Sequence, residues 1–156
     1  MKKIILILAF LACLLNLQHA SACTISEDIL ESVPLNYAGI PNDYRLKLVD
    51  MMLNAQRWPD VEIQAQIIAS AYAGEKNASE LAKSRGKQLK DFLVQIGIKP
   101  QYIYTDTHIV RTPYPLDSTG HSGYLQLGVS LMPLCKGSCA WLCDDPRVKP
   151  TSRAIK

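Results

Sequence analysis

Residues 59–70 read PDVEIQAQIIAS, and this stretch carries the clearest strand signal in the chain. Apolar side chains stand at alternate positions: Val61, Ile63, Ala65, Ile67 and Ala69. A period of two places them on one face of a β-strand. The preceding Trp58-Pro59 pair ends any helix before it, because the residue before proline is pushed out of the helical region. We therefore predict a half-buried strand that follows a helix.

Helical patterns stand on both sides of this strand. Upstream, Asn42 or Asp43 is expected to cap a helix. Its apolar positions have helical spacing: Leu46, Val49, Met52 and Leu53. Downstream, Asn77 and Glu80 have the spacing of a capping box, and Gly97 is a natural stop. The apolar stripe of this second helix consists of Leu81, Leu89, Phe92, Leu93 and Ile96.

Three further strands complete the expected fold. Residues 33–37 form a short apolar-rich stretch, and residues 103–109 and 125–131 alternate between apolar and polar side chains. A polar loop through residues 118–123 separates the last two. The order βαβαββ predicts an α+β domain, in which two helices pack on one face of a small mixed sheet, followed by a cysteine-rich C-terminal tail.

The N-terminus has the three parts of a secretory signal peptide. Lys2 and Lys3 precede the apolar run 4–15, and Ala20-Ser21-Ala22 is a small-x-small cleavage site. We expect cleavage after Ala22 and export to the periplasm. The expected organisation is a signal peptide over 1–22, the α+β domain over 23–134 and the tail over 135–156.

Charge and hydropathy exclude two classes of partner. Residues 1–22 contain two lysines and no acid, so the remaining chain has 15 basic and 14 acidic side chains, and no nucleic acid is expected. The apolar run of the signal is shorter than the roughly 20 residues that span a bilayer, so no transmembrane segment is expected.

Four cysteines remain after the signal peptide, namely Cys23, Cys135, Cys139 and Cys143. An even number in an exported protein indicates two disulfides, although sequence leaves three connectivities open. Because three of the four lie within nine residues, Cys23 is expected to join the N-terminus to the tail.

Two alternatives for these cysteines are less favoured. A lipid anchor on Cys23 would follow a large aliphatic residue three positions upstream, where Ala20 stands, and it would strand three cysteines. A metal site is disfavoured because the spacers are three residues long, against two in common zinc knuckles, and no histidine is near in sequence.

Arg85 is the residue that does not fit its surroundings. It lies four residues from both Leu81 and Leu89, along the apolar stripe of the second helix. A guanidinium there needs an anionic partner. Two hypotheses follow: Arg85 pairs with an internal carboxylate or reaches the edge of the stripe, or it faces the carboxylate of a ligand.

The chain from residue 33 to residue 131 resembles the OmpA-like domain, a periplasmic module that binds peptidoglycan. Residues 59–63 resemble the entry to that family's second strand, and residues 81–86 (LAKSRG) stand where the family has Leu-Ser-x-x-Arg-Ala. Gly97-Ile98, Ile103 and Pro113 fall at the later spacing of the family. The resemblance implies the same fold and a location in the cell envelope.

The resemblance also implies a ligand site, and this sequence departs from it. In the family, an aspartate at the end of the second strand and the helix arginine bind the zwitterionic end of diaminopimelate. Arg85 occupies the arginine position, while Ser70 stands at the aspartate position. We expect Arg85 and Ser70 to mark an eroded peptidoglycan pocket with little or no affinity for diaminopimelate.

No catalytic set is evident in the sequence. The Gly120-His121-Ser122-Gly123 segment lacks one residue of a nucleophile elbow and precedes no helix pattern. Tyr102, Tyr104, Asp106 and His108 alternate on one strand face, as a recognition surface or as the solvated side of a sheet. We expect a non-catalytic envelope binding protein without cofactor or metal, whose partner is the cell wall. The alternative is an inhibitor or immunity protein that binds a protein toxin or enzyme.

Overall fold

The computed structural model describes residues 23–115 and 122–153. The predicted signal peptide and His121 lie outside this part of the chain. The described elements, in order, are β1 (Cys23–Thr24), β2 (Glu27–Glu31), α2 (Asn42–Ala55), β3 (Glu62–Tyr72), α3 (Ala78–Gln95), the 3-10 helix η1 (Pro100–Tyr102), β4 (Ile103–Val110), β5 (Tyr114–Pro115), β6 (Ser122–Gly123), β7 (Leu127–Leu134), the 3-10 helix η2 (Ala140–Asp144) and β8 (Ser152–Arg153).

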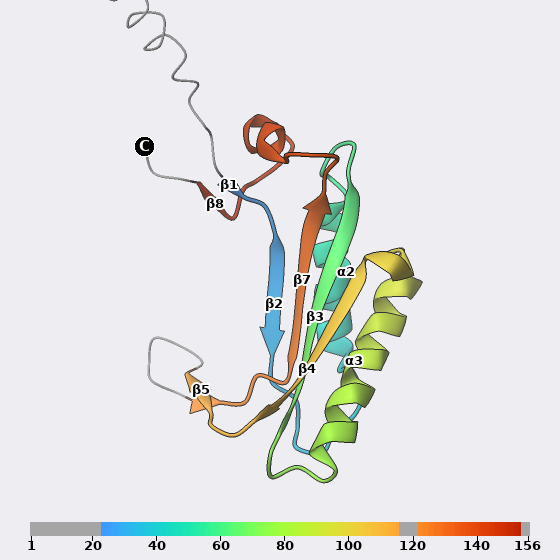
Figure 1. The fold of residues 1–156 in the computed structure, drawn as a ribbon, viewed down its shortest axis with the longest axis vertical. Helices are drawn as coiled ribbons and strands as arrows, with labels where there is room; N and C mark the ends of the chain where they lie inside the picture. The colour runs from blue at the N-terminus through green and yellow to red at the C-terminus, as the bar shows by residue number, and fades with distance from the viewer. Residues whose placement is uncertain (1–22, 116–121, 154–156) are drawn as a thin grey trace, which may run out of the picture.

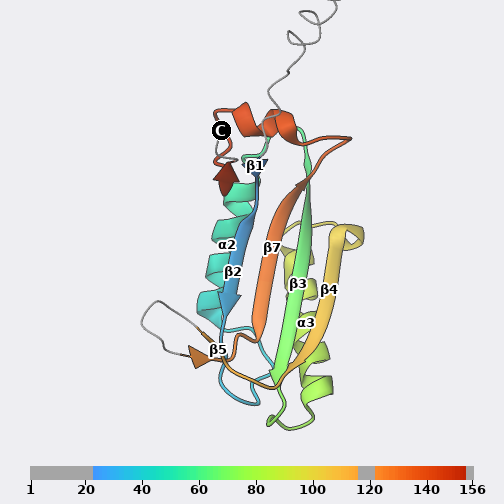
Figure 2. The ribbon, with the colours of Figure 1, turned by 60° about the vertical axis from the view of Figure 1, so that its left-hand side comes forward.

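The main sheet has the order β2-β7-β3-β4 (Figure 2). Strand β7 runs antiparallel to both β2 and β3, whereas β3 and β4 are parallel and are connected through α3. The β3–β4 register is continuous from the Ala65–Ile103 pair to the Tyr72–Val110 pair. The predicted mixed sheet is therefore present, and β3 is its longest strand.

Helices α2 and α3 lie on the same side of this sheet, as predicted (Figures 1 and 2). Helix α3 packs on β3 and β4, and α2 packs on β2 and β7. The alternate side chains of β3 that face them are fully buried: Ala65, Ile67, Ala69 and Ala71. Gly86 allows α3 to approach closely, because a Cβ there would stand 2.9 Å from the Thr105 methyl group. The opposite face of the sheet carries neither long helix.

The first strand is not where the sequence predicts it. Residues 33–37 lie in the connection between β2 and α2, and the strand is Glu27–Glu31 instead. In β2 the outward Leu30 is 58% exposed, while Glu27 and Glu31 share the half-buried side with Ile29, so apolar and polar residues are mixed on both faces. Its pairing with β7 fixes it as a strand without an amphipathic pattern.

The predicted capping box of α3 does not form. Asn77 is the N-cap residue, but it has left-handed backbone angles, φ 48° and ψ 47°, and its side chain caps no backbone N–H. Asparagine tolerates this conformation better than most residues. It turns the chain sharply between Glu75 and the helix.

The cysteines form two disulfides, Cys23–Cys143 and Cys135–Cys139. The first joins the N-terminal strand β1 to η2, and β1 also pairs with β8. Leu142 and Val148 belong to the same buried cluster as the helices and the sheet. The tail thus closes one end of the core, next to the start of the described chain (Figure 1). In the described ranges, no helix has the length and hydropathy to cross a membrane.

Candidate functional site

The candidate site surrounds Arg85 at the end of β3, where α3 begins. Its side chain has no exposed surface, although it carries a permanent charge. Position 85 faces the sheet because Leu81 and Leu89, one turn away on either side, are buried on the same stripe of α3. A charge in this position must be neutralised within the protein.

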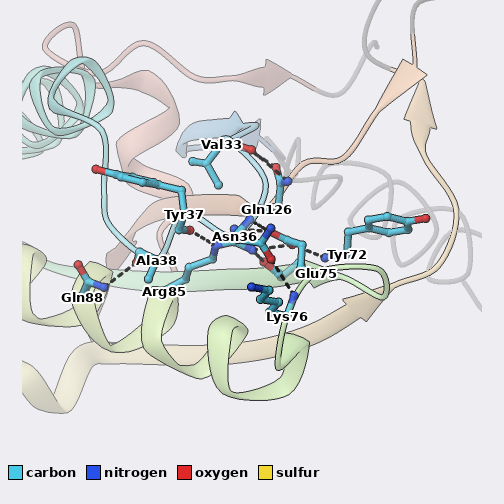
Figure 3. Close-up of polar contacts among 11 residues, drawn as sticks. Val33, Asn36, Tyr37, Ala38, Tyr72, Glu75, Lys76, Arg85, Gln88 and Gln126 are labelled. Atoms are coloured by element: carbon cyan, nitrogen blue, oxygen red, sulfur yellow. Dashed lines mark hydrogen bonds and ion pairs between the residues drawn. The ribbon is translucent and has the colours of Figure 1, made fainter.

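Glu75 provides that neutralisation. Its Oε1 accepts a hydrogen bond from Arg85 Nη2 at 2.7 Å, and its Oε2 accepts one from Nη1 at 3.0 Å (Figure 3). Two parallel contacts of this kind are the strong, geometrically specific mode of arginine–carboxylate pairing. Only 1% of the Glu75 side chain is exposed. Of the two hypotheses for Arg85, the structure therefore contains the internal carboxylate.

The other polar atoms of the pair are also satisfied. Arg85 Nε donates to the Tyr37 carbonyl at 2.9 Å, and Nη1 donates to the Ser70 carbonyl at 2.8 Å. The Glu75 carboxylate accepts from the backbone N–H of Asn36 and that of Tyr72. Every nitrogen of the guanidinium and both carboxylate oxygens thus have protein partners.

These contacts lower the pKa of the Glu75 carboxyl and so favour its ionised form. Burial alone would raise its pKa, since desolvation disfavours the charged form. The Arg85 hydrogen bonds and the two backbone N–H donors outweigh burial, so the pKa of Glu75 lies below its usual value. The pair is a charged one at neutral pH.

Residues 33–38, which we call the strap, cover the pair from the side of the β2–α2 connection (Figure 3). Gln126 fixes one end: its amide accepts from Val33 N–H at 3.0 Å and donates to the Val33 carbonyl at 3.3 Å. Gln88 fixes the other end by donating to the Ala38 carbonyl at 2.6 Å. In between, the side-chain oxygen of Asn36 accepts from Lys76 N–H. The strap is therefore bonded along its length to the elements around the pair.

Ser70, the second predicted ligand residue, contacts Arg85 only through its backbone carbonyl in the described structure. Its side chain lies on the sheet face away from the helices, with those of Ile68 and His108, in a groove of about 420 Å³. A side chain at position 70 therefore points away from the guanidinium. The predicted pair is brought together in space, but its two side chains do not line one pocket.

The strand-face set predicted around His108 is partly present. Tyr104, Asp106 and His108 share the helix-free face of β4, whereas Tyr102 belongs to η1. His108 Nε2 lies 2.9 Å from an Asp106 carboxylate oxygen, and both side chains are more than half exposed. Ser70 is the register neighbour of His108 on β3, but no bond joins them among the described contacts. The described ranges contain no group of three or more histidine, cysteine, aspartate or glutamate side chains placed to hold a metal ion.

Glu75 is the site residue that the sequence did not predict. It is not on the second strand or the helix, but in the turn between them. The only available signal was that a buried arginine needs an acid and that Glu75 is ten residues away.

Comparisons with known proteins give structural neighbours only. The chain matches no protein-family model and no curated protein. Similar solved structures include the OmpA-like domain of FopA1 from Francisella tularensis subsp. tularensis SCHU S4, with 12% identity, a TM-score of 0.48, and coverage of 79% of this chain and 88% of that one. A periplasmic domain of Helicobacter pylori MotB has 15% identity, a TM-score of 0.49, and coverage of 77% and 91%. The OmpA-like domain indicated by the sequence motifs is thus among the similar structures.

Proposed function

We propose that this chain is a non-catalytic binding protein of the cell envelope, built on an OmpA-like scaffold whose arginine pocket is filled by its own Glu75. One observation carries the proposal: the guanidinium that a ligand carboxylate would need is already bonded, at both terminal nitrogens, to an internal carboxylate. A ligand would have to displace a buried, four-bonded carboxylate and open the strap. The wild-type protein should therefore not bind diaminopimelate through Arg85.

The test is calorimetric titration of residues 23–156 with a diaminopimelate-containing muropeptide, beside sedimentation with purified sacculi. We expect no binding by the wild type. Glu75→Ala should gain binding, because it vacates the carboxylate position opposite Arg85, and Glu75→Ala/Arg85→Ala should lose it again. Glu80→Ala is the matched control, since Glu80 is an exposed acid whose ion pair in the described structure is with Lys83 at the surface.

Two outcomes would refute the proposal. Wild-type binding that disappears in Arg85→Ala would show an open pocket. Failure of folded Glu75→Ala to bind would show that Glu75 does not occupy a ligand position. Circular dichroism of each variant establishes that it is folded.

The helix-free sheet face favours a second candidate function, in which the partner is a protein toxin or enzyme. Leu30, Ile68 and Tyr114 line the groove there and are 58%, 37% and 47% exposed. Grouped apolar side chains at the surface are typical of protein interaction sites. Inhibition of a co-purified envelope enzyme or toxin by the wild type, lost in Leu30→Asp, would support it. Leu53→Asp on α2 is the control, because Leu53 is similarly exposed, at 54%, on the helix side. Equal loss in both variants would contradict it.

A further inference from the structure

Strand β4 is an edge of the main sheet with an unprotected outer side. It is the last strand in the order, and in the described ranges it pairs only with β3. Six consecutive residues, 104–109, are exposed, whereas Ile103 and Val110 at its ends are buried. Helix α3 therefore leaves the outer rim of this strand free on both faces.

The two edges of the sheet differ in how they resist pairing. The opposite edge, β2, is only five residues long and contains three acids, Glu27, Asp28 and Glu31. Strand β4 is eight residues long, has an uninterrupted register, and contains one acid, Asp106, and no lysine, arginine or proline. Natural edge strands are usually shortened, charged or bulged because a plain edge accepts another strand. By this criterion β2 is protected and β4 is open to a partner.

The backbone of β4 has a definite set of free groups. The Val110 carbonyl accepts a hydrogen bond from Ala73 N–H at 2.9 Å, so Val110 directs its peptide groups toward β3. Because direction alternates along a strand, Thr105, Thr107 and Ile109 direct theirs toward the free edge. These three residues would form the hydrogen bonds to an added strand.

We propose that β4 pairs antiparallel with β4 of a second copy of this chain, centred on Thr107. This proposal stands apart from the proposed function. If the helices of both copies lie on one side of the joined sheet, an even-numbered residue must stand opposite an even-numbered one, and an odd-numbered residue opposite an odd-numbered one. Near the middle of β4 this leaves three registers, centred on residue 106, 107 or 108. Centring on residue 106 places Asp106 opposite Asp106, and centring on residue 108 places His108 opposite His108. Centring on Thr107 places Asp106 of each copy opposite His108 of the other.

The charge pattern selects this last register. Like charges directly opposite are destabilising in a sheet, which rejects Asp106 opposite Asp106. Centring on residue 108 places Asp106 opposite Val110, whereas centring on Thr107 gives the carboxylate a hydrogen-bonding partner on the other copy. The Asp106–His108 pairs would occupy the non-hydrogen-bonded positions, where side chains approach most closely. Within one chain these groups already lie 2.9 Å apart, so each carboxylate can bond a ring of either copy. The same register places Thr107 opposite Thr107 and Tyr104 opposite Val110, both favourable kinds of cross-strand pair. The result is a continuous eight-stranded sheet from two four-stranded ones.

Single cysteines test the register. All four native cysteines of residues 23–156 are in disulfides, so an added cysteine is the free thiol. At the centre of the proposed pair, Thr107 of each copy lies about 5.5 Å from its equivalent between Cα atoms, within the disulfide range. Mild oxidation should therefore cross-link Thr107→Cys into a dimer on a non-reducing gel. Asp106→Cys and His108→Cys, each displaced from the axis, should remain monomeric. Preferential cross-linking of either of these two would overturn the register.

Sedimentation equilibrium of the unmodified protein tests the association itself. We expect a reversible dimer whose fraction rises with concentration. Thr107→Pro should abolish it without unfolding the domain, since the Thr107 N–H faces the free edge and makes no bond to β3. The control is Leu53→Asp, at an exposed position on α2, and this variant should dimerise normally. A second proline variant such as Thr24→Pro is not a suitable control, because Thr24 pairs with Ser152. The proposal would be overturned if the wild type stays monomeric up to millimolar concentration. This holds even if β4 then pairs with a strand of another protein, because the proposed partner is a second copy of this chain.

Discussion

Glu75 and Arg85 form a two-point ion pair inside the domain, with Oε1–Nη2 and Oε2–Nη1 distances of 2.7 and 3.0 Å. The two residues come from a turn and from the helix that follows it, and at most 1% of either side chain is exposed. Each charge is stable in the interior only because the other is present. The stability of this end of the sheet therefore depends on both side chains being ionised.

Breaking the pair should be costly. Arg85→Ala leaves a buried carboxylate unpaired, and we expect a loss of about 3–5 kcal/mol in the free energy of unfolding, measured in urea. Glu75→Ala should cost a similar amount, and the double variant should cost clearly less than the sum of the two. As a control, Lys83→Ala removes an exposed pair and should cost less than about 1 kcal/mol. A loss as small as the control's for Arg85→Ala would contradict the buried-pair interpretation.

The same pair should make stability depend on acid pH. The folded-state pKa of Glu75 is below its usual value, so the unfolded chain binds the proton first. Its contribution is therefore complete above the unfolded pKa, about 4.3, and is lost as the pH falls through the lower folded value. Glu75→Gln should flatten the pH dependence of unfolding in this window. Asp145, whose pKa is lowered to about 2 mainly by its side-chain hydrogen bond to Arg147, provides the comparison. If the free energy of unfolding changes with pH equally in the wild type and in Glu75→Gln, with Asp145 intact in both, this result would count against the ionised pair.

Tyr44 has the opposite problem, a buried polar atom without a partner. Only 1% of the residue is exposed, and its hydroxyl has no hydrogen bond among the described residues. Burial, with a smaller effect of Glu31, raises the pKa of this hydroxyl above its ordinary value. Tyr44→Phe removes the unsatisfied group and keeps the ring, so we expect unchanged stability or a gain of up to about 1 kcal/mol. Tyr104→Phe, at a 57% exposed ring, should change little. A loss above 1 kcal/mol in Tyr44→Phe alone would indicate a partner for the hydroxyl.

The two disulfides should contribute unequally. Their sequence separations are 120 and 4 residues. In the chain-entropy description, the longer closed loop stabilises by about 5 kcal/mol and the shorter by about 2 kcal/mol. Chemical denaturation of Cys23→Ser/Cys143→Ser and Cys135→Ser/Cys139→Ser should show this order. The reverse order would show that local strain or packing around the tail outweighs loop closure.

The sequence was most informative where side chains alternate and are buried. Strand β3 agrees with the residues that predicted it, because its alternate side chains are covered by the core. Helix α2 exists as predicted, but its buried stripe was only partly identified: Met52 is buried, whereas Leu46 and Leu53 are 68% and 54% exposed. Strand β2 could not be predicted, since acids and apolar residues lie on both of its faces: Asp28 and Leu30 on the exposed one, and Glu27, Ile29 and Glu31 on the half-buried one. Its existence depends on pairing with β7, which is distant in sequence.

Of the two residues of the buried ion pair, the sequence predicted Arg85 and not Glu75. Arg85 was singled out because a charge on an apolar stripe is anomalous, and this reasoning is local. Its partner depends on the left-handed turn at Asn77 and on the strap, both of which are tertiary features. The local expectation for this turn was a capping box between Asn77 and Glu80, whereas Asn77 has left-handed backbone angles and caps no backbone N–H.

The Cys23–Cys143 bond also has a mechanical consequence. It closes a covalent loop whose ends are separated by 120 positions in the sequence, so tension applied at residues 23 and 143 bypasses the sheet and both helices. Under single-molecule stretching, the oxidised domain should not lengthen. After reduction, the released segment should extend by on the order of 400 Å, the contour length of the bypassed chain. The fold is thus shielded from pulling forces for as long as that one bond is intact.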